Sequence, residues 1–237
     1  MKLLAFDTST ETLSLAVGRT VDGQPVAWTH TGPGGAQASA TLIPQALALL
    51  AQAGLSLREL DAVVFGCGPG SFTGLRTACS VAQGLAYGAG VPVLPVDTLL
   101  AVAEEARHHS GAHSIQALLD ARMDEVYSAD YEFGAGRWQQ GGDFRLSRPE
   151  QVRVAAGQVL AGNAFMAYGP RLPAGAPRIE ALPTASALLR LAPALLAAGQ
   201  AVPPGQALPR YIRDKVAKTT QERADERAAA AAPSPLA

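Results

Sequence analysis

The sequence has little cysteine and no long apolar run. Its two cysteines, Cys67 and Cys79, form no Cys-x-x-Cys pattern, so the sequence predicts neither a disulfide framework nor a zinc knuckle. The apolar run that follows Lys2 ends at Phe6, which is too short for the hydrophobic part of a signal peptide. No stretch approaches the roughly 20 apolar residues of a membrane-spanning helix. We therefore expect a cytoplasmic protein that does not associate with membranes.

The chain also lacks an excess of either charge. Its 19 basic and 20 acidic residues give a net charge of -1. A protein that binds a phosphate backbone on its own needs clustered lysine and arginine. We therefore do not expect this chain to bind RNA tightly by itself. Because 48% of its 237 residues are hydrophobic, the chain can bury a sizeable core, in one large or two small domains.

Apolar periodicity in the first half predicts an α/β arrangement. Strands are expected at residues 3–6, 13–17, 25–29, 62–65 and 92–96, and helices at residues 40–53, 75–87 and 98–108. Glycines follow the first two helices, and Asp97 or Thr98 is expected at the N-cap of the third. A glycine-rich loop over residues 66–74 connects a buried strand to the second helix.

The second half repeats the order of the first. Residues 116–120 resemble residues 3–7, because each is an apolar strand that ends in Asp and precedes a turn and an alternating strand. Residues 158–163 resemble the step from strand to glycine at residues 64–68. We infer an internal duplication with its boundary near residues 105–113.

This duplication predicts an N-terminal domain at residues 1–108 and a C-terminal domain at residues 109–216. The second domain is expected to contain strands at 114–120 and 125–133, a hairpin loop at 134–142, a longer loop at 168–177, and a helix at 185–198. Pro193 should kink or interrupt that helix. Residues 217–237 have too little apolar variety to pack, so a disordered tail is expected there.

The glycine-rich loop and the first strand suggest a phosphate site. Glycines let a backbone approach an anion closely, and the start of the following helix offers unpaired N–H groups. Asp7 ends the first strand, where a carboxylate could hold a metal ion through water. These features predict a vestigial nucleotide or phosphate site formed by Asp7, Thr8, Gly68, Gly70 and Ser71. A tight structural turn is the alternative, since the loop matches neither a P-loop nor a dinucleotide-binding fingerprint.

The other polar groups do not assemble a catalytic site. Asp120 takes the place of Asp7 in the second half, but capping of a polar turn is the favoured interpretation for it. His109 and His113 have the spacing of a helical metal pair, although the Ser-Gly pair between them should end the helix. No Ser/His/Asp or Cys/His grouping can be built from neighbouring motifs. The sequence therefore predicts no catalytic residue and no metal site.

Four motifs resemble one family of proteins. They are Asp7-Thr8-Ser9-Thr10, the block GPGSFTGLR from Gly68 to Arg76, DARMDEVY from Asp120 to Tyr127, and PRYIR from Pro209 to Arg213. The last two are similar to the family patterns D-A-R-x-x-E-V-Y and P-x-Y-L-R. The glycine block is specific, and the motifs keep their order from residue 3 to about residue 216. The chain thus resembles the TsaB family of subunits for threonylcarbamoyladenosine biosynthesis in tRNA, also described as glycoprotease-like.

The resemblance implies the actin-like ATPase (ASKHA) fold, in which two duplicated RNase H-like domains surround a cleft. It also implies a non-catalytic subunit that pairs with the paralogue TsaD and works with the ATPase TsaE. TsaD transfers threonylcarbamoyl from its adenylate to N6 of the adenosine beside the anticodon, in tRNAs that read codons beginning with A. TsaD carries an H-x-x-x-H metal motif near its first long helix, whereas the corresponding residues 37–43 here contain no histidine.

The resemblance further implies how the chain meets its partners. It would form a heterodimer with TsaD or a homodimer, contact tRNA only through the complex, and require no cofactor, although a nucleotide could bind at a subunit interface. Family members pair through helices of the first domain, which implies a partner surface at Leu42, Leu49, Phe72, Thr73, Leu75, Arg76 and Cys79. The apolar pattern of residues 75–87, taken alone, instead favours a helix buried in the core. Arg210, Arg213 and Lys215 form a basic cluster, which is either a solvated chain end or a contact to TsaD, TsaE or RNA.

Two other functions stay open at this point. An ATPase or small-molecule kinase of the same fold would use Asp7 and the glycine loop, but the sequence near Gly162 supplies no second acid and no base can be assigned. A peptidase rests only on the glycoprotease-like description, because no nucleophile or metal cluster is apparent.

Overall fold

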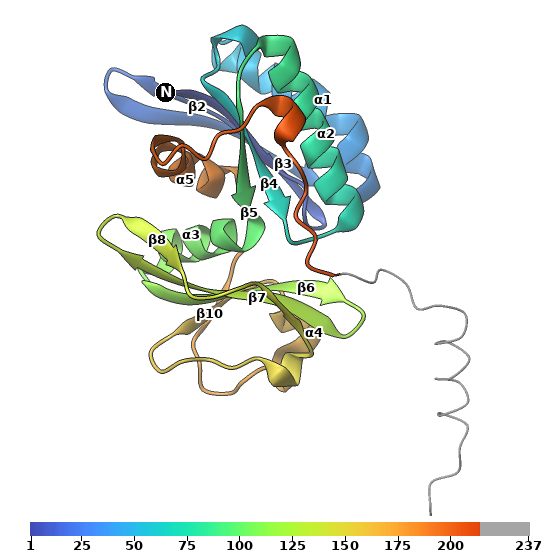
Figure 1. Cartoon of the computed structure of the whole chain (residues 1–237), viewed down its shortest axis with the longest axis vertical. Coiled ribbons are helices and arrows are strands. Elements are labelled where there is room, and N and C mark those ends of the chain that lie inside the picture. The colour runs from blue at the N-terminus through green and yellow to red at the C-terminus, as the bar shows by residue number, and fades with distance from the viewer. Residues whose placement is uncertain (214–237) are drawn as a thin grey trace, which may run out of the picture.

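The computed structural model of the chain describes residues 1–213 (Figure 1). Lys215 and the tail expected at residues 217–237 lie outside the described residues. Within residues 1–213, none of the helices has the length and apolar character needed to cross a membrane. The molecule has two lobes, each built around one β-sheet, and the two sheets lie one above the other in Figure 1.

The first sheet has the strand order β3-β2-β1-β4-β5, in which β1 is antiparallel to β2 and parallel to β4. Its strands are β1 (Lys2–Asp7), β2 (Thr12–Val21), β3 (Gln24–Pro33), β4 (Ala62–Gly68) and β5 (Val93–Asp97). The helices of the first half are α1 (Ala38–Gln52), α2 (Phe72–Ala89) and α3 (Thr98–Ser110). All the strands and helices predicted for residues 1–108 are therefore confirmed, with ends that differ by a few residues.

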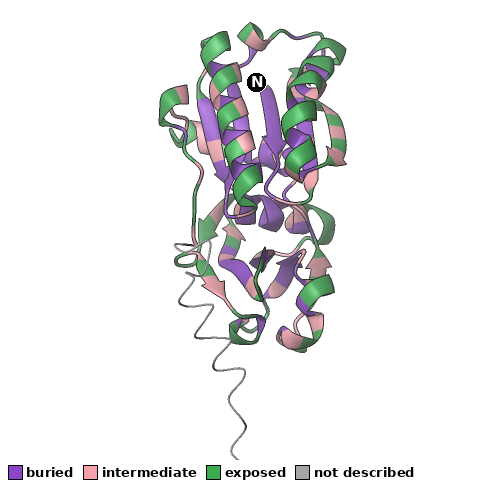
Figure 2. Ribbon diagram, turned by 90° about the vertical axis from the view of Figure 1, so that its right-hand side faces the viewer, coloured by how far each residue is buried: buried purple, intermediate pink, exposed green. Residues whose placement is uncertain are grey.

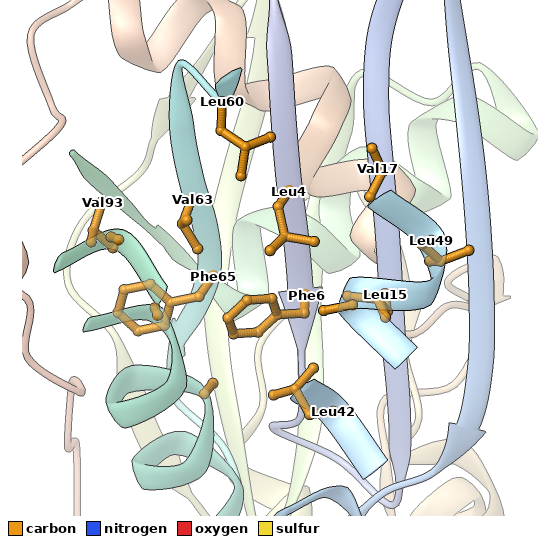
Figure 3. Close-up of a cluster of buried hydrophobic side chains, with 14 of the residues drawn as sticks. Leu4, Phe6, Leu15, Val17, Leu42, Leu49, Leu60, Val63, Phe65 and Val93 are labelled. Atoms are coloured by element: carbon orange, nitrogen blue, oxygen red, sulfur yellow. The ribbon is translucent and has the colours of Figure 1, made fainter. Parts of the chain in front are cut away.

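Both faces of the first sheet are covered, which explains its nearly continuous apolar strands. In β1, Leu4 and Phe6 pack on one face with residues of α1 and α2 (Figure 3). Leu3 and Ala5, which alternate with them, pack on the other face with Leu188 of the last helix. Figure 2 shows the result, with buried residues along the strands and exposed residues on the outer sides of the helices.

The second sheet has the order β11-β10-β6-β7-β8, with β9 paired to β7. Its strands are β6 (Ser114–Arg122), β7 (Glu125–Gly134), β8 (Arg137–Gln140), β9 (Arg145–Ser147), β10 (Val159–Gly162) and β11 (Arg178–Glu180). As in the first sheet, an antiparallel meander (β6, β7, β8) is followed by two parallel strands (β10, β11). The predicted duplication thus appears as the same strand order in both halves.

Three local predictions for the second half need correction. The segment at 134–142 is not all loop, because residues 137–140 form β8 and the turn itself is confined to Ala135 and Gly136. The short helix α4 (Phe165–Tyr168) reaches into the loop expected at 168–177. Helix α5 (Ala185–Ala197) continues through Pro193 without interruption. Single 3-10 turns lie at Gly35–Gln37, Leu57–Glu59, Pro149–Gln151, Gly169–Arg171 and Pro204–Gln206.

The two lobes exchange helices. Helix α3 follows the first sheet along the chain but packs on the second sheet through residues such as Leu99 and Val102. Helix α5 follows the second sheet but packs on the first sheet through Leu188 and Leu191. The boundary expected near residues 105–113 coincides with the end of α3, but a linear division at 108/109 does not describe the packing. Each sheet is completed by a helix from the other half of the chain.

Candidate functional site

A cleft of about 650 Å³ lies between the two lobes. It is formed by the loop after β1, the start of α2, the β6–β7 turn and a segment near residue 213. The lining includes Ser9, Thr10, Glu11, Gly70, Ser71, Phe72, Leu75, Arg76, Asp120, Arg122, Met123, Asn163, Arg210, Tyr211 and Arg213. Two of the family motifs, the glycine block and DARMDEVY, therefore meet at one cleft.

Asp7 is enclosed at the end of β1 and does not line the cleft. Its side chain is fully buried, and its Oδ1 accepts hydrogen bonds from the backbone N–H (2.8 Å) and the hydroxyl (2.6 Å) of Ser9. Its Oδ2 has no hydrogen-bond partner among residues 1–213 and faces Gly66, where an added Cβ would lie only 1.7 Å away. Burial outweighs the two hydrogen bonds and raises the pKa of Asp7 to about 6. A ligand in the cleft cannot reach this carboxylate without rearrangement of the loop.

The glycines of the loop allow close packing against the residues that follow β1. Thr8 is buried, and its hydroxyl donates a hydrogen bond to the Gly74 carbonyl (2.7 Å). A Cβ at Gly74 would lie 1.8 Å from the Thr8 carbonyl oxygen, and a Cβ at Gly70 would lie 2.6 Å from the Ser9 Cβ. The geometry therefore supports the alternative of a structural turn.

This packing places only part of the predicted phosphate site at the cleft. Of its five residues, Gly70 and Ser71 line the cleft, whereas Asp7, Thr8 and Gly68 do not. Gly68 has a positive φ of 127°, and a Cβ there would lie 2.4 Å from the Arg210 carbonyl oxygen. The Ser71 hydroxyl caps α2 by accepting from the Gly74 N–H. Because the Asp7 carboxylate is enclosed and the Thr8 hydroxyl donates within the loop, these two side chains are not placed to hold a metal-bound nucleotide phosphate.

Asp120 caps its own turn, which confirms the favoured interpretation. Its Oδ1 accepts from the Arg122 N–H (2.7 Å) and from the Tyr168 hydroxyl (3.0 Å), and its Oδ2 lies 3.2 Å from the Arg122 guanidinium. The Asp120 N–H donates to the Asn163 side chain (2.9 Å). Asp120 therefore lines the cleft with both carboxylate oxygens already paired.

The β6–β7 turn is strained. Arg122, Met123 and Asp124 have positive φ values of 59°, 55° and 66°, a left-handed conformation that costs roughly 1 kcal/mol for each residue with a Cβ. Consecutive left-handed residues other than glycine persist only where the surroundings hold them. Here Asp120 binds the turn from within its own strand, and Arg171 donates to Asp124 (2.9 Å). The sequence did not reveal this strain, because no glycine marks the turn.

An exposed aromatic and cationic group lies at the cleft rim. The Arg76 guanidinium lies 3.7 Å from the centre of the Phe72 ring, and its Nε donates to the Tyr211 hydroxyl (3.0 Å). The Phe72 and Tyr211 rings are 5.1 Å apart. Such aromatic and arginine clusters are typical of binding surfaces. Tyr211 was not among the predicted site residues, although it lies in the PRYIR motif.

The expected partner surface is wrong for four of its seven residues. Leu42, Leu49, Leu75 and Cys79 are at most 5% exposed, and their side chains contribute to the core rather than to an outer face. Phe72, Thr73 and Arg76 are exposed at the start of α2. The outer faces of α1 and α2 present other residues instead, namely Ile43, Leu47, Ser80, Gly84 and Tyr87. These two helices contain no charged residue except Arg76.

The two described members of the basic cluster, Arg210 and Arg213, form ion pairs within the chain. Arg210 lies 2.6 Å from Asp97, which occupies the N-cap position of α3 without capping it by its side chain. Arg213 lies 2.7 Å from Glu125 and is largely buried. The Arg210 side chain is still 48% exposed beside Asp97, whereas Arg213 is mostly enclosed by its partners.

His109 and His113 are separated by the end of a helix, as the Ser-Gly pair between them predicted. His109 lies in the last turn of α3, and His113 lies beyond Gly111, which ends that helix in a left-handed conformation. The two rings therefore do not share a helix face. Over residues 1–213, His, Cys, Asp and Glu side chains form no group of three or more that could hold a metal ion.

Comparison with known proteins gives consistent matches. A family model described as TsaD, tRNA N6-adenosine threonylcarbamoyltransferase, matches residues 33–163. The tRNA threonylcarbamoyladenosine biosynthesis protein TsaB of Escherichia coli is 34% identical over 228 residues, which cover 92% of this chain and 96% of that protein. The protein of the same name from Haemophilus influenzae is 37% identical over 70% of each chain. The solved structure of YeaZ from Pseudomonas aeruginosa matches with a TM-score of 0.81 and 39% identity, covering 89% of this chain and 99% of that one.

Proposed function

Since the chain belongs to the TsaB family, with the predicted fold of two RNase H-like halves, we propose that it is the non-catalytic partner of TsaD in threonylcarbamoyladenosine biosynthesis. Membership of this family supports a role in the biosynthesis of threonylcarbamoyladenosine in tRNA. In the proposed reaction, TsaD transfers threonylcarbamoyl to N6 of the adenosine beside the anticodon while this chain is bound to TsaD. TsaE joins the assembly, tRNA contacts the assembly rather than this chain alone, and the complex works in the cytoplasm.

The observation that carries the proposal is the enclosure of Asp7. An enzyme that transfers a phosphoryl group needs carboxylates that face the cleft and hold its metal ions. In this chain the carboxylate at the end of β1 is fully buried against Gly66 and Ser9. The matching Asp120 is paired on both oxygens. These arrangements favour a supporting role over the alternative of an ATPase or small-molecule kinase.

The outer faces of α1 and α2 suit the contact with TsaD. Ile43 and Leu47 on α1 and Tyr87 on α2 are large apolar side chains that are 41%, 46% and 83% exposed. Ser80 and Gly84 are small, exposed residues of α2, and they would let another helix approach closely. Neighbouring exposed apolar residues with few charges are characteristic of protein interfaces. The same face could pair two copies of this chain when TsaD is absent.

The test is reconstitution from purified components. Size-exclusion chromatography with light scattering is run on the chain alone, on TsaD from the same organism, and on their mixture. We expect a one-to-one complex, and threonylcarbamoyl transfer to tRNA only when both proteins and TsaE are present. ATP turnover by the isolated chain would favour the ATPase alternative. Full transfer by TsaD and TsaE without this chain would refute the proposal.

A further inference from the structure

The segment Ala207–Arg213, which we call the strap, is bound along the first lobe. Its Ala207 carbonyl accepts from Gln83 of α2 (2.9 Å), and the Arg210 N–H donates to the Cys67 carbonyl at the end of β4 (2.7 Å). The Arg210 guanidinium binds Asp97, and Tyr211 stacks on Phe72. In Figure 1 the strap descends beside α2 toward the level of β6. The first lobe therefore holds the strap along its length, through both backbone and side chains.

The end of the strap is bound to the second lobe. Arg213 donates to the Ala121 carbonyl (3.1 Å), to the Arg122 carbonyl (3.3 Å) and to the Glu125 carboxylate (2.7 Å). Ile212 packs against the core cluster between α3 and the second sheet. The Arg213 side chain is only 13% exposed, so its charge is held by these partners rather than by water. One short segment thus spans from α2 to the β6–β7 turn.

The contacts of Arg213 fall on the strained part of that turn. The two carbonyls belong to Ala121 and Arg122, at the point where φ becomes positive. Arg122 in turn reaches across the cleft to Glu11, 2.6 Å away in the first lobe. If Arg213 were released, the turn would lose partners that oppose its return to ordinary backbone conformations. The direct contact between Arg122 and Glu11 would then lose its support, and it is an exposed pair of low intrinsic strength.

We propose that the strap sets the separation of the two lobes, with Arg213 as the positioning residue that holds the β6–β7 turn against the first lobe. When Arg213 is bound, the turn keeps its left-handed conformation and the cleft keeps its present width. When Arg213 is released, the turn relaxes, the second lobe moves away and the cleft opens. This inference concerns conformation alone and stands whether or not the chain pairs with TsaD.

The experiment measures lobe separation in the full chain. Spin labels are attached to Gln52→Cys at the end of α1 and Met166→Cys on α4, two exposed positions in different lobes. The native cysteines are both buried and should not react. Electron-electron double resonance should give one distance for the parent chain. Arg213→Gln should add a second, longer distance, and trypsin should cleave after Arg122 roughly tenfold faster.

A matched control distinguishes this effect from the general loss of an arginine. Arg178 also donates to backbone carbonyls, those of Gly169, Leu172 and Pro173, but all of them belong to the second lobe. Arg178→Gln should therefore leave the label distance unchanged. Glu125→Gln keeps the size of its side chain and removes one charge, so it should shift the distance in the same direction by less. If Arg213→Gln does not fold, Glu125→Gln provides the test of the label distance in its place.

Two outcomes would overturn the proposal. The first is an unchanged distance in folded Arg213→Gln and Glu125→Gln, whatever happens to trypsin cleavage. The second is an equal shift in Arg178→Gln, which would mean that any loosening of the second lobe moves the label. Restoration of the parent distance by Arg213→Lys, which retains the charge, would support electrostatic positioning by this residue.

Discussion

The Asp7 carboxylate and the Gly66 backbone are in direct contact, so closely that a Cβ on Gly66 would lie 1.7 Å from Asp7 Oδ2. This contact joins the end of β1 to the end of β4, two parallel neighbours in the first sheet. It removes Asp7 from the cleft and makes Gly66 a requirement of packing. Asp7 and Gly66 therefore contribute to packing between β1 and β4 rather than to ligand binding.

Gly66→Ala should destabilise the chain by about 3 kcal/mol or prevent folding, because the new methyl group overlaps a buried carboxylate that cannot move away. Urea unfolding of the purified variant measures the loss. Gly84→Ala is the matched control, since nothing lies within 4 Å of a Cβ there. It should raise the free energy of unfolding by about 0.5–1 kcal/mol through helix propensity. A loss below about 1 kcal/mol for Gly66→Ala would contradict the predicted overlap.

Because Asp7 is buried, the free energy of unfolding should decrease as the pH rises from about 4 to about 6. Burial in the fold raises the pKa of its carboxyl group from the ordinary value of 3.8 to about 6. Between these values the folded state binds more protons than the unfolded state, so stability decreases with increasing pH. Above pH 6 the carboxylate is charged in both states, and the difference of about 2 between the two pKa values corresponds to about 3 kcal/mol. Asp7→Asn should remove this part of the pH dependence and gain stability at pH 7, as measured by unfolding at several pH values.

Met123→Gly should stabilise the isolated chain by about 0.5–1 kcal/mol, because glycine adopts the left-handed conformation without strain. Met123 is 53% exposed, and the contact of its sulfur with Arg213 (3.1 Å) is the main interaction lost with its side chain. Met123→Ile, with a branched Cβ in the same conformation, should instead lose about 1–2 kcal/mol. Thermal unfolding of the two variants provides the measurement. If both variants lost the same stability, the strain assigned to this turn would be disproved.

Leu47→Asp should abolish the proposed complex with TsaD while leaving the fold intact. Leu47 is 46% exposed on α1, and a charge at the centre of an apolar interface is desolvated without a partner. Met166→Asp introduces the same charge at a site that is 91% exposed in the second lobe, and it should have no effect on pairing. Light scattering of each mixture with TsaD reports the complex, and circular dichroism reports folding. A stable complex with Leu47→Asp would move the interface away from α1.

Much of the architecture was determined by the sequence alone. The continuous apolar run of β1, the partial alternation of β2, and the glycines after α1 and α2 were sufficient to predict these elements, because apolar patterns and chain breaks are local properties. The repeat of an apolar strand that ends in Asp, at Asp7 and Asp120, predicted the duplication. Short strands such as β8 were missed, since four residues carry too little pattern.

Only the tertiary structure decided which surfaces face inward. Helix α1 carries two apolar stripes, one with Leu42 and Leu49 and one with Ile43 and Leu47, and the sequence cannot say which one the sheet covers. The exchange of α3 and α5 between lobes, the enclosure of Asp7 by Gly66, and the binding of Arg213 to Glu125 join residues far apart along the chain. Such contacts follow from packing of the whole chain, because burial and strain depend on neighbours that no local pattern identifies.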